Sequence, residues 1–377
     1  MALYSSLLIP DALEWHEDPN YSFAVAGALT RAYQILKTAH HTLDGYLAAY
    51  AELAPYRDSR MAAQQRMHVD FSFALCYLGE DAIPQALDSL DRALEGGESL
   101  GDQPAQIELN YLAGQTSFMA TEFANAHDYF LTGLESLQAL AHDAAPIDSE
   151  LAVDFLLRLS TISYQLGLHN YSGRLLEDAS LIFTRWGSHS RLNTSTLDWN
   201  RIQHYRLAGN LDLALRTAIH TADDVEKLGS PSASGRIQTI VAEIASDIGN
   251  SYSLETATDA RLHYVNLARP YAERARQLTT SAGDLVGNGL ARLALLRLDR
   301  LRGIEHSRLP ALHILERKAQ RLHDPALLGR VWTAMADEFA AGGNIEWARK
   351  WYSKAQRHLE EYELIAMARL PLRARLR

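Results

Sequence analysis

Polar and aromatic side chains recur three or four positions apart along several stretches of this sequence. Residues with this spacing share one face of a helix, so each group is expected to line one helix face. The groups are Tyr111, Gln115 and Phe118; Arg158, Thr161 and Tyr164; Trp199, Asn200, Gln203 and Arg206; Glu243 and Asp247; and Arg297 and Arg300. Guanidinium and amide groups beside aromatic rings suit a ligand carboxylate and a peptide backbone. The pattern predicts a ligand-binding surface, and the alternative is that these side chains bond to one another or to water.

The residues Arg158, Asn200, Gln203 and Arg206 indicate the class of ligand. Two guanidinium groups and two amides suit a carboxylate or backbone carbonyls better than a purely apolar molecule. We therefore expect a protein or peptide segment that is acidic or is bound by its C-terminus. On this hypothesis Arg206→Ala weakens binding by about 1.5 to 3 kcal/mol and leaves folding almost unchanged.

Motifs of catalysis and cofactor binding are missing from the sequence. It contains no HExxH metal motif, no GxSxG elbow and no glycine-rich phosphate loop with its lysine. Histidines are scattered, and neither the adjacent pair nor the C-terminal group has the spacing of metal ligands: His40 and His41; His306, His313 and His323. We therefore expect neither enzyme activity nor a cofactor nor a metal.

The single cysteine and the start of the chain bear on the cellular compartment. Cys76 lies in an apolar run, so it is expected to be a small buried residue, and it cannot form a disulfide within the chain. No run of 18 apolar residues occurs, and residues 1–19 lack the basic region and long apolar stretch of a signal peptide. These features predict a cytoplasmic protein without a membrane partner.

Charge is distributed unevenly along the chain. The formal net charge is -10, but residues 1–150 carry 22 acidic and 6 basic side chains, whereas residues 261–377 carry 12 acidic and 21 basic ones. This asymmetry could steer an acidic partner to the C-terminal third or favour head-to-tail contacts in a homo-oligomer. The alternative is that both ends present ordinary solvated faces.

A basic cluster in the C-terminal third offers a competing binding surface. Its members are Arg292, Arg297, Arg300, Arg302, Arg308, Arg317, Lys318 and Arg321. Stacking on single-stranded bases requires aromatic rings, and few lie among these residues. The pattern therefore favours a solvated face over binding of nucleic acid.

Helical hairpins are predicted to position these side chains. In residues 331–356, apolar and small residues recur at helical spacing on both sides of a glycine turn: Trp332, Met335, Ala336 and Phe339, then Gly342, Gly343 and Asn344, then Ala348, Tyr352 and Ala355. Helices approach closely only where a facing residue is small, so the three alanines are expected at the contact. Related turns are predicted at positions 121, 167, 209, 303 and 343, with threonine in place of glycine at the first.

This order of residue types resembles the tetratricopeptide repeat (TPR), a helix-turn-helix unit that stacks into a solenoid. The resemblance implies an all-α fold, an α-solenoid of about seven or eight hairpins in a right-handed superhelix, with a concave groove lined by the first helix of every repeat. The repeat of roughly 40 residues also resembles the arrays in the sensor regions of bacterial transcriptional regulators, including those that bind signalling peptides.

The resemblance implies a non-enzymatic scaffold that binds a protein or peptide segment in its groove. The alternative is a ligand-sensing regulatory domain, for a peptide or small molecule, of the bacterial regulator type without its DNA-binding domain. Residues 1–20 are too short and too acidic to present a basic recognition helix.

Three parts of the chain are expected. Residues 1–20 form an N-terminal arm, residues 21–368 a single TPR-like helical repeat domain, and residues 369–377 a basic C-terminal tail. The last helix is predicted to run from Trp347 to about Ala368 and to cap the array. An irregular stretch over 249–258 is expected to project as a loop.

Overall fold

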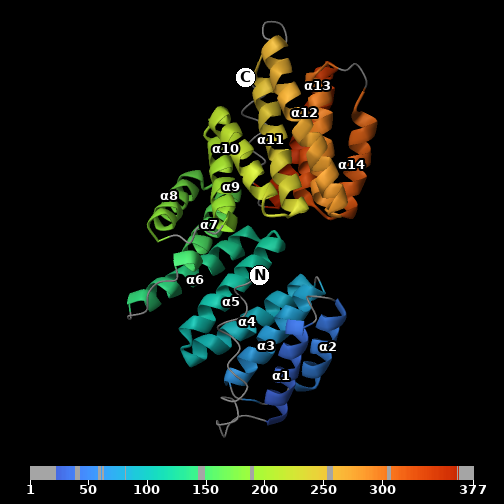
Figure 1. Ribbon diagram of the computed structural model, residues 1–377. Helices are drawn as coiled ribbons and strands as arrows, with labels where there is room; N and C mark the ends of the chain where they lie inside the picture. The colour runs from blue at the N-terminus through green and yellow to red at the C-terminus, as the bar shows by residue number, and fades with distance from the viewer. Residues whose placement is uncertain are drawn as a thin grey trace. The chain divides into compact units, whose positions relative to one another are not determined.

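The computed structural model describes residues 23–38, 43–57, 61, 63–80, 82–142, 149–186, 191–252, 258–303, 307–362 and 364. Every regular element in these ranges is helical: sixteen α-helices and one short 3-10 helix (Figure 1). The prediction of an all-α fold is confirmed, and sixteen helices in consecutive pairs agree with seven or eight hairpins. No helix in the described ranges is long and apolar enough to cross a membrane.

Contacts divide the chain into two compact units, Met1–Ile162 and Ser163–Arg377, here called the N-terminal unit and the C-terminal unit. Helices of the N-terminal unit are α1 (Phe23–Thr38), α2 (Leu43–Leu53), the 3-10 helix Ala54–Tyr56, α3 (Ala63–Gly79), α4 (Ile83–Leu100), α5 (Gln103–Met119), α6 (Phe123–His142) and most of α7 (Ser149–Gln165). Rings from three of these helices, Tyr111, Phe130 and Phe155, meet edge to face in the core. Edge-to-face packing of this kind joins successive hairpins.

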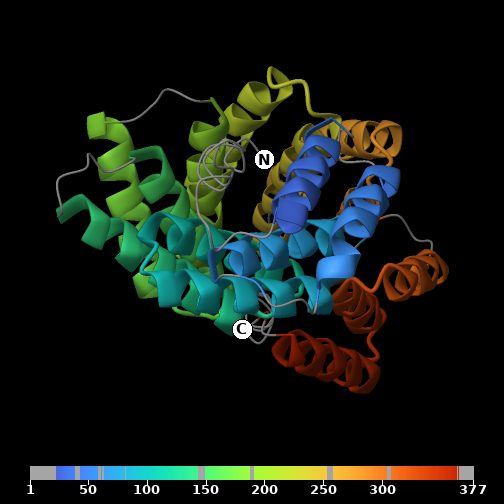
Figure 2. The same cartoon turned by 90° about the horizontal axis from the view of Figure 1, so that it is seen from below.

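The C-terminal unit continues the pattern. Its further helices are α8 (His169–Trp186), α9 (Arg191–Leu207), α10 (Leu211–Glu226), α11 (Pro231–Ser251), α12 (Thr258–Ser281), α13 (Leu285–Leu301), α14 (Leu309–Arg321), α15 (Pro325–Ala341) and α16 (Ile345–Glu361). Helix α11 contacts both α12 and α13, and α13 contacts α15 as well as α14, so the first helices of successive hairpins adjoin (Figures 1 and 2). This stacking of first helix on first helix is the arrangement of a helical repeat.

The predicted turn positions share one backbone conformation. Thr121, Gly167, Gly209, Gly303 and Gly343 have φ values of 62°, 78°, 79°, 76° and 77°. Left-handed backbone of this kind ends helices, and glycine adopts it at the lowest cost. The repeat register predicted from the sequence is therefore confirmed, including the position where threonine stands in place of glycine.

Small residues lie where the two helices of the last hairpin meet. Ala336, Ala348 and Ala355 are buried, as the spacing predicts. Gly329 on α15 faces Leu359 on α16 so closely that an added Cβ would lie 2.5 Å from a Leu359 methyl carbon. The close approach of α15 and α16 therefore depends on residues without a large side chain.

The end of the last helix differs from the prediction. Helix α16 ends at Glu361, not near Ala368, and the Leu364 amide donates to the Leu359 carbonyl oxygen at 2.7 Å. Glu360 and Glu361 lie in the last turn of α16, where the helix dipole disfavours negative charge. Leu364 is buried, and its burial stabilises the end of the helix at this point. Residues 249–251 of the predicted loop are helical and belong to α11, so that part of the prediction is wrong. The predicted arm, the tail, His40, His41 and residues 253–257 of the predicted loop lie outside the described residues.

Candidate functional site

Three residues of the predicted surface meet in the N-terminal unit. The Tyr111 hydroxyl donates to Asp154, and the Gln115 side-chain amide donates to the Tyr111 oxygen at 2.8 Å. The Arg158 Nε lies 3.8 Å from the same Asp154 carboxylate. Burial raises the pKa of Tyr111, and the charge of Asp154 raises it further, so the phenol remains protonated and donates. Sequence reasoning missed Asp154, although it lies one helical turn before Arg158 on the same face.

Two other residues predicted for this part of the surface, Thr161 and Phe118, contact other residues of the hairpins. The Thr161 hydroxyl donates to the Leu157 carbonyl oxygen of its own helix at 2.9 Å. The Phe118 ring packs on Phe123 across the turn between α5 and α6, with ring centroids 5.4 Å apart. These two side chains therefore stabilise the hairpins. Of the predicted surface in this unit, the polar side chains that lie together are Tyr111, Gln115 and Arg158, with Asp154.

A buried ion cluster lies in the C-terminal unit. The Arg206 guanidinium contacts Glu243 at 3.5 Å and Asp247 at 3.0 Å, and the Arg330 guanidinium donates to the other oxygen of Glu243. Side-chain exposure is 8% for Arg206 and 3% for Glu243. We call Arg206, Glu243, Asp247 and Arg330 the Glu243 cluster. It joins α9, α11 and α15, so three first helices contribute to one polar centre.

Opposing effects set the charge state of the cluster. Burial alone would raise the pKa of Glu243, but the attraction of Arg330, Arg206 and Arg297 outweighs it and lowers that pKa. Burial raises the pKa of Tyr164, which lies nearby. Glu243 is therefore ionised at neutral pH and Tyr164 is neutral. Sequence reasoning missed Arg330 because the apolar packing positions of its helix dominated the pattern there.

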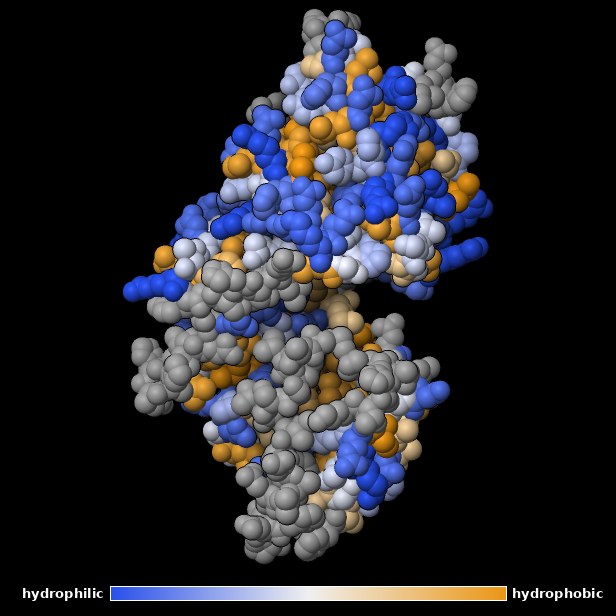
Figure 3. Space-filling model, viewed as in Figure 1, coloured by the Kyte–Doolittle hydropathy of each residue, from blue (hydrophilic) through white to orange (hydrophobic). Residues whose placement is uncertain are grey.

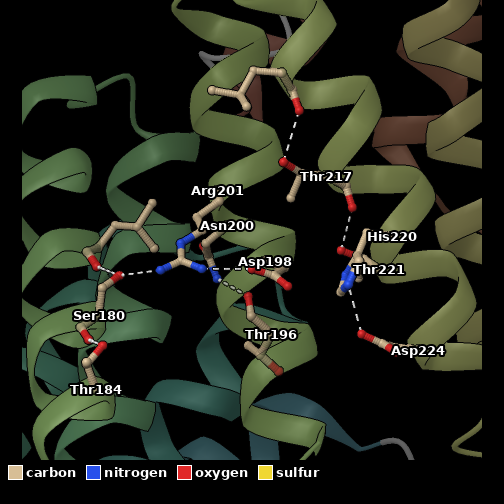
Figure 4. Close-up of polar contacts among 12 residues, drawn as sticks. Ser180, Thr184, Thr196, Asp198, Asn200, Arg201, Thr217, His220, Thr221 and Asp224 are labelled. Atoms are coloured by element: carbon tan, nitrogen blue, oxygen red, sulfur yellow. Dashed lines mark hydrogen bonds and ion pairs between the residues drawn. The ribbon is translucent and has the colours of Figure 1, made fainter.

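Helix α9 turns its remaining polar residues in different directions. Asn200 is buried and donates to the Thr196 carbonyl oxygen of its own helix at 3.0 Å. Arg201, which the prediction did not include, reaches Asp198 at 2.9 Å and the Ser180 hydroxyl of α8 at 3.3 Å (Figure 4). Gln203 is half-buried, and Trp199 packs against the core. Arg201 therefore fastens α9 to α8, and Gln203 keeps a side-chain amide near the surface.

Arg297 and Arg300 line one small depression between α13, α14 and α15. Arg300 is ion-paired with Asp337 at 3.2 Å, and burial lowers the pKa of Arg300. Arg308, the residue before α14, was assigned only to the basic cluster, yet it lines the same depression and contacts Glu338 at 2.9 Å. The predicted residues thus form separate groups: one in the N-terminal unit and two in the C-terminal unit.

The surface of the described residues agrees with polar recognition. On the face shown in Figure 3, the C-terminal unit is mostly hydrophilic, with smaller hydrophobic patches between the polar side chains. Within the described ranges, no three His, Cys, Asp or Glu side chains are grouped so that they could hold a metal ion. The available chemistry is that of guanidinium, carboxylate, amide and phenol groups.

The fold belongs to the class of TPR-like helical repeats. Among similar solved structures are the apo form of the quorum sensor NprR from B. thuringiensis (13% identity, TM-score 0.65, 92% of this chain and 91% of that one) and a Rap protein complexed with competence and sporulation factor (14%, 0.55, 93% and 96%). A third is the Rap conjugation gene regulator of plasmid pLS20 in complex with the Phr peptide (11%, 0.59, 91% and 97%). At these identities the likeness shows the fold.

Comparison at the level of sequence gives no relative. No protein-family model matches this chain, and no curated protein matches its sequence.

Proposed function

We propose that this chain binds a peptide or protein segment along the first helices of its repeats and does not act as an enzyme. The observation that carries the proposal is the concentration of charged, half-buried or buried groups on α9, α11, α13 and α15. Guanidinium and amide groups at a partly dry surface bind carboxylates and backbone carbonyls in fixed geometry. The similar Rap structures, solved with competence and sporulation factor and with the Phr peptide, support a ligand of this kind.

Charge favours an acidic or C-terminal segment over a basic one. The arginines of α13, α14 and α15 lie in the part of the sequence with excess positive charge, and such a surface attracts anionic groups. Nucleic acid and membrane are not part of the proposal, and we place the activity in the cytoplasm.

A pooled library of short synthetic peptides tests the proposal. Each sequence is present once with a free C-terminal carboxylate and once as the amide, and bound members are recovered by size exclusion and identified by mass spectrometry. We expect enrichment of acidic peptides and of free carboxylates. Recovery equal to that from a heat-unfolded sample, for every member of the library, would contradict the proposal.

Two variants locate the bound segment. Arg158→Gln changes the N-terminal unit and Gln203→Ala the C-terminal unit, and the exposed Arg349→Ala on α16 is the matched control. A tenfold loss of affinity in either of the first two, with the control unchanged, supports binding at the predicted surface. The side chain of Arg349 is exposed, so its removal is expected to be nearly neutral.

A second candidate function is a ligand-sensing regulatory domain. It is favoured by the likeness to the quorum sensor NprR and to a conjugation gene regulator. A sensor must bind its signal with different affinity in two conformations, whereas a scaffold binds without changing shape. Small-angle scattering with and without an enriched peptide separates the two, because only the sensor is expected to change its radius of gyration.

A further inference from the structure

Lysine is rare in this chain, so each of its side-chain amines can be distinguished. The sequence holds 36 lysines and arginines, and five of them are lysines: Lys37, Lys227, Lys318, Lys350 and Lys354. The structure describes the side chains of the last four, which all lie in the C-terminal unit. Their surroundings can therefore be compared one by one.

Three of these four amines contact a group that attracts positive charge. The partners are Asp224 at 2.8 Å for Lys227, the Trp347 ring at 4.7 Å for Lys350, and Glu316 at 3.7 Å for Lys354. Carboxylates and the faces of aromatic rings attract the ammonium form of lysine. An ammonium group is not nucleophilic, because its nitrogen has no lone pair.

Lys318 is the exception among the four. Its Nζ donates to the Asn288 Oδ1 at 3.4 Å, a neutral acceptor, and it forms no ion pair with any described residue. Asn288 is buried, and its amide nitrogen donates to the Thr280 hydroxyl at 2.7 Å, which fixes the amide oxygen toward Lys318. Lys318 itself is half-buried, so a small molecule can reach its nitrogen.

Positive charge accumulates around Lys318 without compensation. Arg292 faces it from α13, and Arg321 follows it by one helical turn on α14. Both arginines are exposed, and neither has an ion pair or a hydrogen bond among the described residues. The carboxylate that acts on Lys318 is Asp284, which is held by Arg236 at 2.8 Å.

These surroundings favour the neutral amine of Lys318. Burial lowers the pKa of Lys318, the charge of Arg292 lowers it further, and Asp284 offsets only part of this effect. Desolvation and a neighbouring cation are the usual means by which a lysine becomes a nucleophile. Guanidinium groups without a partner bind phosphate in two-point geometry. A nucleophile and two phosphate-binding groups thus lie on one surface.

We propose that Lys318 is a site of acylation by acyl phosphates, with Arg292 and Arg321 binding the phosphate while the Lys318 nitrogen attacks the acyl carbon. The C–N bond forms and the C–O bond to phosphate breaks. Phosphate leaves with that electron pair and takes up the amine proton, and nothing is oxidised or reduced. The product amide retains one N–H for Asn288. The proposal is independent of the proposed function, since none of these residues belongs to the predicted ligand surface.

Acetyl phosphate is the probe, applied to the folded full chain at neutral pH. Cleavage after glutamate followed by mass spectrometry gives the rate of acetylation at each lysine. We expect the rate at Lys318 to exceed those at Lys227, Lys350 and Lys354 by about threefold or more. N-hydroxysuccinimidyl acetate, which is uncharged and carries no phosphate, is the second reagent. With it the ratio of the rate at Lys318 to that at Lys350 is expected to be smaller.

Arg292→Gln tests the part that the neighbouring cation plays. We expect it to lower the rate at Lys318 by about threefold and to leave the rate at Lys227 unchanged. The matched control is Arg302→Gln, which removes the same charge from the exposed residue after α13. Arg302 lies about 15 Å from Arg292 along the helix axis, beyond the screening length of about 10 Å at 0.1 M salt. The control is therefore expected to leave the rate at Lys318 unchanged.

Thermal unfolding verifies that both variants fold, and the comparison among lysines on the unaltered chain needs no variant. A rate at Lys318 no higher than that at Lys227 would overturn the inference. An equal ratio of Lys318 to Lys350 with the two reagents would also overturn it, because the phosphate would then play no part. The same holds for an unchanged rate in Arg292→Gln, and for a preference for Lys318 that persists in urea, where α13 and α14 no longer adjoin.

Discussion

Glu243 on α11 and Arg330 on α15 form an ion pair although 87 positions separate them in the chain. The same carboxylate contacts Arg206 on α9 at 3.5 Å. One buried side chain therefore joins the first helices of three hairpins. A buried charge is costly unless it is paired, so the packing of these helices and the pairing of Glu243 depend on each other.

Replacing Glu243 tests this dependence. Glu243→Ala leaves the buried Arg206 without its innermost partner, and the free energy of unfolding is expected to fall by about 3 to 5 kcal/mol. Glu243→Gln retains an oxygen acceptor and is expected to lose less. Urea denaturation measures both, with the exposed Asp223→Ala of α10 as control. A loss below about 1 kcal/mol in Glu243→Ala would show that the cluster does not stabilise the unit.

The structure also changes the expectation for Arg206. Its side chain is only 8% exposed and holds Glu243 and Asp247, so Arg206→Ala cannot leave folding almost unchanged. We expect a loss of about 1.5 to 3 kcal/mol in the free energy of unfolding, the range for hydrogen bonds to charged groups, because Glu243 retains Arg330. Urea denaturation of Arg206→Ala, with Arg349→Ala as the control, measures this loss. Equal midpoints for the two variants would contradict the pairing of Arg206 with Glu243 and Asp247.

The hairpins and their register were predictable from the sequence because both depend on neighbouring residues. Left-handed turns at Gly209 and Gly343 follow from glycine at the end of a helical pattern, and Thr121 was recognised by its place in the repeat. Buried Ala348 follows in the same way from its spacing. Such features require no knowledge of how one hairpin lies on the next.

The pairing of the charged residues was not predictable. Arg206, Glu243 and Asp247 were assigned to helix faces, but their contact depends on the rotation of α9 relative to α11. Arg330 comes from a hairpin far along the chain. Periodicity identifies the face of a helix and does not identify its partner, so free and mutually paired arginines gave the same pattern. The position where α16 ends was not predicted because it depends on the burial of Leu364, which is a tertiary contact.

The last hairpin provides a test of the repeat register. Ala348 is buried at the contact of α15 with α16, whereas Arg349 is exposed. Ala348→Leu forces extra methylene groups into this contact and is expected to cost about 1 to 3 kcal/mol. Arg349→Ala is expected to stay within about 0.5 kcal/mol. Thermal unfolding of both variants checks this, and equal melting temperatures would contradict the register.

Glu108 on α5 should make stability depend on pH near neutrality. Burial and the charge of Asp102 raise its pKa to about 7, from about 4.3 in an unfolded chain. The folded state therefore holds the proton more tightly, and the stability gained from this is complete below pH 4.3 and disappears as the pH rises through 7. Glu108→Gln lacks this titration, so we expect it to be more stable than the unaltered chain at pH 8 and nearly equal at pH 4.5.

Melting temperatures of both proteins between pH 4.5 and 8 provide the measurement. Burial lowers the pKa of His68 on α3 to about 4, and this titration occurs in both proteins and cancels in the difference. A difference between the two melting curves that is constant over this pH range would show that the pKa of Glu108 is not raised.

Thr121 and Gly343 occupy equivalent left-handed turns. Removing the side chain at 121 and adding one at 343 are therefore expected to change the free energy of unfolding in opposite directions. Thr121 has a φ of 62°, a region that costs a residue with a Cβ about 1 to 2 kcal/mol. Glycine avoids this cost but loses about 0.5 to 1 kcal/mol more backbone entropy on folding. Thr121→Gly is therefore expected to raise the free energy of unfolding by about 0.5 to 1 kcal/mol.

Gly343→Ala is the reciprocal variant. At its φ of 77° an added Cβ meets no atom within 4 Å, so the whole cost is conformational. We expect a loss of about 1 kcal/mol, measured by urea denaturation together with Thr121→Gly. Since the two changes lie in different hairpins, their effects should add in the double variant. A destabilised Thr121→Gly would mean that the threonine side chain contributes more to its turn than the left-handed backbone costs.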